Sequence, residues 1–291
     1  MEGFLEKLYL SIVRGVTIDP DSLKISLGKG GTLDTVIKSM FDVMMTLGIA
    51  LTVAYFLLEM NRRLLFERSD FTVKSVLAPL VKLVAVIFFL KQAWNIVVTL
   101  TDCHNWIIEQ AKSWGDASKL NDWQKDLAST HPFKSLGLIA KCIACLPMII
   151  GWLVSVVCTF VYWYKSIGYK IEYLYRLGLS PVAFADVYSG NNSNAYRWFK
   201  GFFGFAMYGA AFILIPKIAL GITQDTYAIF WEKSGEVVTE GMFDNPATTA
   251  ATLAADSIWT FIKFIFLQML APIAAIGTIS SVRQLTKEAF N

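Results

Sequence analysis

One stretch of this chain restricts its fold more than any other. The run from Cys142 to Tyr164 contains no charged residue and is longer than the roughly 20 residues that a helix needs to cross a hydrocarbon core of about 30 Å. It also lacks the polar face with a 3.6-residue period that helices in soluble cores usually show. We therefore expect a membrane-spanning helix here, in preference to a buried helix of a soluble protein.

Four further segments are apolar enough and, with their flanking residues, long enough to cross a membrane. The predicted spans are residues 39–58, 75–100, 137–164, 201–223 and 258–282, of which the last contains the uncharged run Phe264–Val282. The composition agrees, because 55% hydrophobic residues with only 17% charged ones is unusual for a soluble protein. The sequence thus predicts an all-α fold, an integral membrane bundle of about five helices with residues 283–291 as a tail.

The N-terminal segment, residues 1–38, is predicted to lie outside this bundle. Phe4, Leu5, Leu8 and Ile12 share one helical face, so the segment favours an amphipathic helix, either on the outer membrane surface or packed on the protein. Glu6 and Lys7 interrupt the apolar stretch, and no cleavable signal peptide is expected.

The basic residues predict an orientation. Lysines and arginines cluster after the first, third and fifth spans, whereas the connections after the second and fourth are acidic. Because positive residues stay on the cytoplasmic side, we expect the N-terminus outside and the C-terminus in the cytoplasm.

No motif in the sequence indicates catalysis. Cys142 and Cys145 have a CxxC spacing but lack the second ligand pair of a structural zinc site. Cys103 could pair with Cys142 near the outer face, although free thiols are the simpler expectation for these two and for Cys158. We predict neither an enzyme nor a cofactor nor a metal site.

Charged residues near or within the predicted spans are the first candidates for function. They are Lys82, Lys91, Lys141, Lys217, Lys263 and, at the outer end of the first span, Asp42. A charge at bilayer depth costs about 2.5–3.5 kcal/mol, so such residues are often functional. The lysines either reach the interface by snorkelling or form a basic ring that faces a hydrated cavity or another subunit.

A second candidate lies between the third and fourth spans. Lys165–Gly178 is predicted to prolong the third helix, with its tyrosines at the inner interface, and Leu179–Tyr188 is apolar but too short to cross. Pro181 disfavours a helix at Ser180, so the aromatic residues that follow must turn elsewhere. We expect residues 178–200 to be interfacial, with Pro181, Phe184, Tyr188 and Trp198 either embedded in lipid or docked on a partner.

This central pattern resembles the TrbL-like polytopic inner-membrane subunits of conjugative type IV secretion systems, which are related to the sixth VirB protein. The resemblance rests on a long third helix, an apolar Ser-Pro segment, a turn and an aromatic anchor. The matching residues are Pro181, Phe184, Tyr188, Trp198 and Phe202 within Leu177–Met207. The resemblance covers about a tenth of the chain.

The resemblance implies a non-enzymatic subunit of a channel that translocates DNA or protein across the bacterial cytoplasmic membrane. It also implies several copies of the chain, contacts with lipid, other secretion subunits and cytoplasmic ATPases, and transient contact with the transferred molecule. Two other classes stay open. Prolines inside four spans would suit the broken helices of a small-solute transporter or ion channel, and a membrane scaffold would need no conduit.

Overall fold

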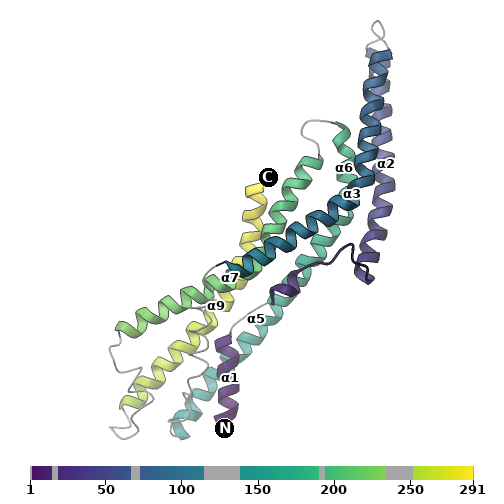
Figure 1. Ribbon diagram of the computed structural model, residues 1–291. Coiled ribbons are helices and arrows are strands. Elements are labelled where there is room, and N and C mark those ends of the chain that lie inside the picture. The colour runs from purple at the N-terminus through teal and green to yellow at the C-terminus, as the bar shows by residue number, and fades with distance from the viewer. Residues whose placement is uncertain are drawn as a thin grey trace. The chain divides into compact units, whose positions relative to one another are not determined.

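Helices make up every regular element of the part that the computed structural model describes, residues 2–14, 19–66, 73–114, 138–189, 194–233 and 252–290 (Figure 1). In chain order they are α1 (Glu2–Arg14), the 3-10 helix η1 (Pro20–Leu23), α2 (Thr32–Phe66), α3 (Val73–Ser113), α5 (Leu138–Gly178), α6 (Ser180–Ala185), the 3-10 helix η3 (Asp186–Ser189), α7 (Asn194–Lys233) and α9 (Thr252–Phe290). The predicted all-α class is confirmed. Five of the helices, α2, α3, α5, α7 and α9, are long and apolar enough to cross a membrane.

These helices extend well past the spans predicted from apolar runs. α3 and α5 have 41 residues each, which at 1.5 Å per residue makes them about 60 Å long, twice a hydrocarbon core. The predicted continuation of the third helix through Lys165 to Gly178 is confirmed. A helix of this length either tilts strongly or projects from the bilayer.

The chain divides into two compact units, and α3, α5, α7 and α9 each contribute to both. The first unit contains residues 1–22, 110–166 and 210–282. Its core joins α1 to α5 and α9 through buried apolar side chains, namely Leu5, Leu8, Tyr9, Ile12, Ala144, Met148, Ile265 and Met269. Leu5, Leu8 and Ile12 of the predicted apolar face are therefore packed on protein, one of the two alternatives for this segment, whereas Phe4 is 54% exposed.

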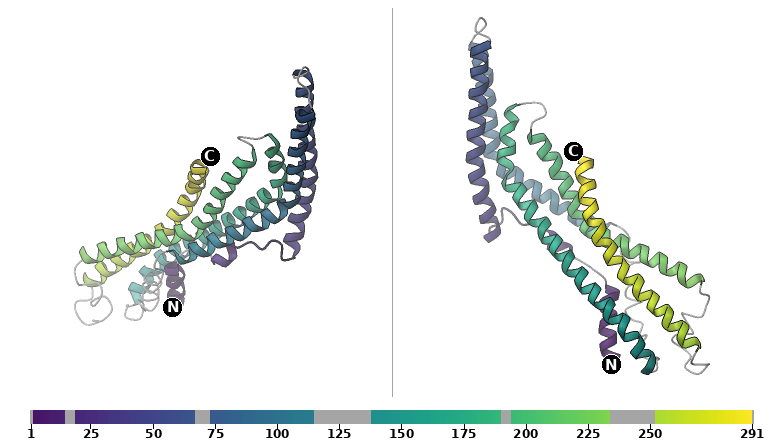
Figure 2. Two further views of the ribbon diagram at one scale, coloured as in Figure 1. Left: turned by 45° about the horizontal axis from the view of Figure 1, so that its top comes forward. Right: turned by 180° about the vertical axis from the view of Figure 1, so that it is seen from behind.

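The second unit contains residues 23–109, 167–209 and 283–291. α2 and α3 lie side by side and antiparallel (Figures 1 and 2), with the rings of Phe41 and Trp94 5.1 Å apart. α6 and η3 pack along α2. One stripe of α3 faces this core with the helical spacing of Val86, Leu90, Ala93 and Val97.

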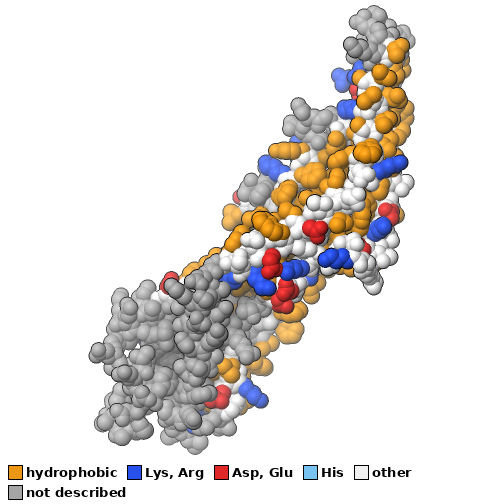
Figure 3. Space-filling model, in the orientation of Figure 1, with side chains coloured by type: hydrophobic (Ala, Val, Ile, Leu, Met, Phe, Trp, Pro, Cys, Tyr) orange, Lys and Arg blue, Asp and Glu red, His pale blue; other side chains and the backbone are white. Residues whose placement is uncertain are grey.

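The outer faces of α2 and α3 are strongly apolar over much of their length. Exposed side chains include Leu58 (64%), Val84 (61%) and Phe88 (65%), and orange side chains cover this pair in Figure 3. An apolar exterior of this extent is what a protein surrounded by lipid requires. The predicted membrane location, as a multi-pass protein, follows from these five helices.

Candidate functional site

The site begins at the break between α5 and α6. α5 ends at Gly178, and α6 starts at Ser180 with Pro181 in its first turn. The Ser180 hydroxyl donates to the Leu177 carbonyl at 2.7 Å, and the Leu179 amide donates to the Tyr175 carbonyl at 3.1 Å. The break therefore leaves these groups satisfied.

The expectation that Pro181 would keep Ser180 out of a helix is wrong. Ser180 is the first residue of α6, and Leu179 before it has a helical backbone. The proline is tolerated because first-turn amides have no intrahelical acceptor, so its missing N–H removes no helical bond. What the proline prevents is continuation of the α5 hydrogen-bond ladder across it.

The break between α5 and α6 packs against a face of α2 that is formed by small and flexible residues. A side chain at Gly48 would place its Cβ 2.7 Å from the carbonyl oxygen of Pro181, so only glycine permits this approach. One turn later, the buried Thr52 hydroxyl donates to the Gly48 carbonyl at 2.8 Å. The Met40 side chain closes over Gly178.

Aromatic rings fill the space between α6, α3 and the start of α7. The Phe184 ring is fully buried, and its centroid lies 5.4 Å from that of Phe89 and 5.1 Å from those of Trp198 and Phe199. Trp198 stacks on Phe202 at 5.2 Å. Three of the five residues that carry the family resemblance, Phe184, Trp198 and Phe202, thus lie in one packed region of the second unit, and Pro181 lies between this region and α2.

Charged side chains close the end of this region beside η3. The Lys82 ammonium lies 4.5 Å from the centre of the Tyr188 ring, and Glu59 pairs with Arg63 at 2.9 Å. Tyr188 is 2% exposed, and its hydroxyl makes no hydrogen bond of ordinary geometry to any described residue, although the Glu59 carboxylate is its charged neighbour. Burial first, and then Glu59, raise the pKa of Tyr188 well above its usual range.

The predicted docking residues are therefore enclosed by their own chain. Pro181, Phe184 and Tyr188 are buried, and Trp198 is half-buried. Their rings stabilise the second unit, so a partner that binds this segment has to contact the exposed residues around it.

The predicted lysine ring divides between the two units. In the second unit, Lys82 is half-buried over Tyr188, Lys91 is exposed on α3, and Asp42 is exposed on α2. In the first unit, Lys141 is half-buried and Lys263 is exposed. The predicted set of charged residues is therefore not contained in one unit.

Lys217 has a specific structural position. Its ammonium donates to the carbonyl oxygen of Lys112 at 2.8 Å and to that of Trp114 at 3.3 Å. These carbonyls lie at the C-terminus of α3, where the helix has unsatisfied acceptors and a partial negative charge. Lys217 thus caps another helix, a role that neither snorkelling nor a basic ring describes.

The second unit also contains a buried polar cluster that the sequence did not reveal. His104 is fully buried, its Nδ1 lies 3.4 Å from the Tyr169 hydroxyl, and its ring centre lies 4.5 Å from that of Tyr173. Tyr169 and Tyr173, which were predicted to lie at the membrane interface, are 2% and 0% exposed, so their rings contact protein and not lipid. Tyr175 is 56% exposed and still suits an interface.

An ion cluster ties the C-terminal tail to α5. Glu172 accepts from Arg176 at 2.9 Å and also from Arg283 on α9, and the Arg176 guanidinium lies 4.5 Å from the Phe205 ring centre. The i,i+4 spacing of Glu172 and Arg176 was visible in the sequence, but the contribution of Arg283 required the fold.

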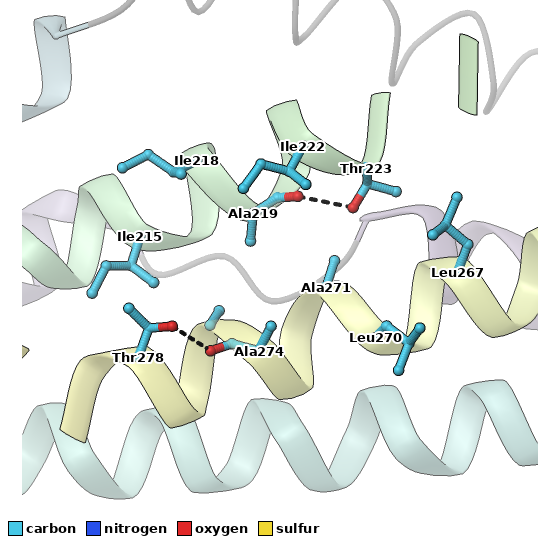
Figure 4. A pocket seen from close by; sticks show the side chains of 11 residues that line it. Ile215, Ile218, Ala219, Ile222, Thr223, Leu267, Leu270, Ala271, Ala274 and Thr278 are labelled. Carbon is cyan, nitrogen blue, oxygen red and sulfur yellow. Dashed lines mark hydrogen bonds between the residues drawn. The ribbon is translucent and has the colours of Figure 1, made fainter. Parts of the chain in front are cut away.

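An apolar groove lies between α7 and α9 in the first unit (Figure 4). It has a volume of about 230 Å³ and is lined by Ile215, Ile218, Ala219, Ile222, Thr223, Leu267, Leu270, Ala271, Ala274, Ala275 and Thr278. Its two threonines donate to carbonyls of their own helices, Thr223 to Ala219 and Thr278 to Ala274, each at 2.8 Å. The groove therefore offers a ligand mainly apolar contacts.

The cysteines are all free thiols. Cys103 and Cys145 are half-buried, Cys142 is exposed and Cys158 is buried. Across the described ranges, no three His, Cys, Asp or Glu side chains come together in a way that could hold a metal ion.

Comparison with known proteins gives no assignment. No protein-family model, no curated protein and no solved structure matches this chain.

Proposed function

We propose that this chain is a structural subunit of the inner-membrane complex of a type IV secretion, or conjugation, machine. In this role it sits in the bacterial cytoplasmic membrane with its N-terminus outside and takes part in translocating DNA or protein. Its partners are lipid, further copies of itself, other secretion subunits and cytoplasmic ATPases. It contributes a scaffold or channel wall and no catalysis.

The observation that carries the proposal is the coherence of the segment that resembles TrbL-like subunits. The Trp198 ring packs against the rings of Phe184 and Phe202. The Pro181 carbonyl lies so close to Gly48 of α2 that a Cβ there would be 2.7 Å from its oxygen. A pattern of common interfacial residues that matched by chance would not need to form one core. The helix–break–helix geometry supports a role in which α6 and η3 hold a fixed shape between two long helices.

The transporter alternative has lost part of its support. It drew on prolines inside the spans, which would suit broken helices around a binding site. Pro79, Pro147, Pro216 and Pro272 instead lie inside helices that continue past them. The scaffold alternative differs from the proposal only in lacking a transferred substrate.

Deletion and complementation test the proposal directly. The gene is removed from a donor cell that carries the complete set of neighbouring genes, and the transfer of DNA to a recipient is counted. We expect transfer to fall by at least about a hundredfold and the wild-type chain to restore it. Unchanged transfer, in a strain where the deletion is verified, rejects the proposal, and uptake of a small solute by vesicles containing the purified chain would favour a transporter.

Partner binding is tested with exposed residues, because the buried rings are needed for folding. Tyr196 is 64% exposed and Arg197 is also exposed, both in the first turns of α7 beside the central segment. The double variant Tyr196→Ala, Arg197→Ala should insert normally and co-purify with less of the cytoplasmic ATPase. The matched control is Phe203→Ala, an exposed ring two turns further along the same helix (40%).

A further inference from the structure

The exposed face of α3 changes its chemistry along the helix. Up to Phe88 it is apolar, with Val81, Val84 and Phe88 each at least 59% exposed. From Lys91 to Asp102 the exposed side chains are polar and recur at helical spacing, namely Lys91, Gln92, Asn95, Thr99 and Asp102, which we call the polar stripe; the exposed ring of Trp106 (61%) follows it. The opposite face is mostly apolar and also buries Thr101 and His104, so α3 resembles a membrane helix up to Phe88 and the amphipathic helix of a soluble protein along the polar stripe.

Lipid is a poor medium for the polar stripe. Lys91 has neither a hydrogen bond nor an ion pair among the residues that the structure describes, and it faces away from the core. A lysine at the centre of the bilayer costs about 2.5–3.5 kcal/mol, and polar groups in spans ordinarily face a protein interior or water. Gln92 and Asn95 bond to each other at 2.9 Å but leave their other amide groups open.

The pairing of α2 with α3 places the start of the stripe at the end of an apolar region. Trp94 contacts Phe41 at 5.1 Å, and the Lys38 ammonium lies 6.0 Å from the Trp94 ring centre. Lys91, one turn before Trp94, is therefore near the level of Asp42. At this level the uncharged stretch of α2, residues 43–58, begins.

The irregular segment between η1 and α2, residues 24–31, packs along the C-terminal half of α3. The Asn105 side chain accepts from the Ile25 amide at 2.9 Å and donates to the Ile25 carbonyl at 2.7 Å, while Lys24 pairs with Glu109 at 2.6 Å. Irregular backbone does not occur exposed to lipid inside the hydrocarbon region, because its polar groups would lack partners. In Figure 3, red and blue side chains gather across the middle of the described surface, and orange side chains predominate on the α2–α3 pair, where some blue ones also occur.

We propose that the membrane-spanning part of α3 ends near Lys91 and that its exposed face from Lys91 to Asp102 lies in water. That face is then open to polar solutes and water-soluble partners and closed to lipid. The predicted span of residues 75–100 becomes shorter, and Lys91 becomes a boundary residue. The inference goes beyond the secretion role, because it requires only that the chain is a membrane protein.

Thiol reactivity along one face of one helix tests this inference. Single cysteines replace Gln92, Asn95 or Thr99 in the full chain, with Cys103→Ser in the parent to remove the nearest native thiol. Val84→Cys and Phe88→Cys are the matched controls, since both are exposed on the same face of α3. All variants are expressed with the neighbouring genes, and membranes opened to both sides are treated with a membrane-impermeant, sulfonated methanethiosulfonate.

We expect the stripe cysteines to react at least about tenfold faster than Val84→Cys and Phe88→Cys after the labelling of the parent is subtracted. Only the thiolate reacts, and a thiol surrounded by hydrocarbon stays protonated. Stripe cysteines that react as slowly as the controls would overturn the inference, whether lipid or another subunit covers them. Equal, fast reaction at Val84 would overturn it too. DNA transfer is scored separately in the same strains, so failure here and failure of the secretion proposal are distinguishable.

Discussion

The Tyr173 hydroxyl on α5 lies 3.5 Å from the Leu100 carbonyl on α3. The charge pattern assigns these residues to opposite faces of the membrane, Leu100 to the outer end of the second span and Tyr173 to the inner interface. Atoms in contact lie at the same depth, whereas the two faces of a hydrocarbon core are about 30 Å apart, so at least one of these two assignments does not hold for the second unit. Any arrangement of the second unit in a membrane must therefore place Tyr173 and Leu100 at the same depth.

Gly48→Val should destabilise the protein. Its Cβ would meet the Pro181 carbonyl oxygen at 2.7 Å, and a backbone atom cannot move aside as a flexible side chain can. Overpacking of this kind costs about 1–3 kcal/mol, which thermal unfolding of the detergent-solubilised chain should register as a lower Tm. Gly221→Val is the control, because nothing lies within 4 Å of a Cβ at Gly221. An equal effect at both positions would mean that valine acts through helix propensity alone.

Lys217→Met should lower stability by about 1 kcal/mol, since it removes a charge-assisted bond to the C-terminus of α3. Lys217→Arg keeps the positive charge and should recover part of the loss. Lys91→Met, which removes an exposed lysine without such bonds, should leave the unfolding temperature nearly unchanged. If Lys217→Met and Lys91→Met unfold alike, the contacts to Lys112 and Trp114 contribute nothing.

Tyr188 should make stability depend on pH in the alkaline range. Its pKa is raised in the folded state, so above pH 10 the unfolded chain loses this proton more readily than the folded chain does. The corresponding stabilisation is fully present below about pH 10 and is lost as the pH rises toward the folded-state pKa. Tyr188→Phe should therefore show a flatter decline of Tm between pH 9 and pH 11 than the wild type. Parallel curves would contradict the assignment.

Phe184→Ala should cost about 3–5 kcal/mol, the usual effect of removing a fully buried ring. Phe203→Ala, at an exposed position, should cost far less. Size-exclusion profiles and thermal unfolding of both variants check this difference. A stable Phe184→Ala protein that had lost only its partners would restore the ring to a docking role.

The predicted orientation is tested by single cysteines in whole cells. Those at Asp122 and Glu236 should react with an impermeant thiol reagent, whereas those at Arg63 and Asn192 should not. Asp122, Glu236 and Asn192 lie outside the described residues, so here the sequence alone carries the prediction. Labelling at Asn192 in unpermeabilised cells would reverse the orientation.

The sequence predicted helices well and their ends poorly. An uncharged run such as Cys142–Tyr164 specifies a helix because a lipid-exposed backbone must bond to itself. The continuation past Lys165 depends on partners far along the chain, because its ammonium donates to the Ile276 carbonyl at 3.0 Å and also to the Ser280 hydroxyl. Hydropathy registers a lysine only as a charge and carries no information about such acceptors.

The sequence indicated where the chain breaks between α5 and α7, but it did not indicate which side chains there are buried. The Ser-Pro break and the rings around it were visible as a pattern, and burial of Phe184 and Tyr188 was not, since aromatic residues suit both an interface and a core. His104 gave no local signal, because its neighbours Tyr169 and Tyr173 come from another helix. The polar stripe could have been found, because Lys91, Asn95, Thr99 and Asp102 recur at helical spacing in the sequence itself.

The bond between Lys217 and Lys112 joins residues 105 positions apart. At about 5–20 residues per second of synthesis, the acceptors at the end of α3 emerge roughly 5–20 seconds before the lysine that binds them. Insertion of α7 into the bilayer thus brings a charge whose partner has been made already. Because α3 is synthesised first, its C-terminal carbonyls are available when α7 inserts. The Lys217 ammonium can then bond to them, which favours insertion of α7 beside the earlier helices of the same chain.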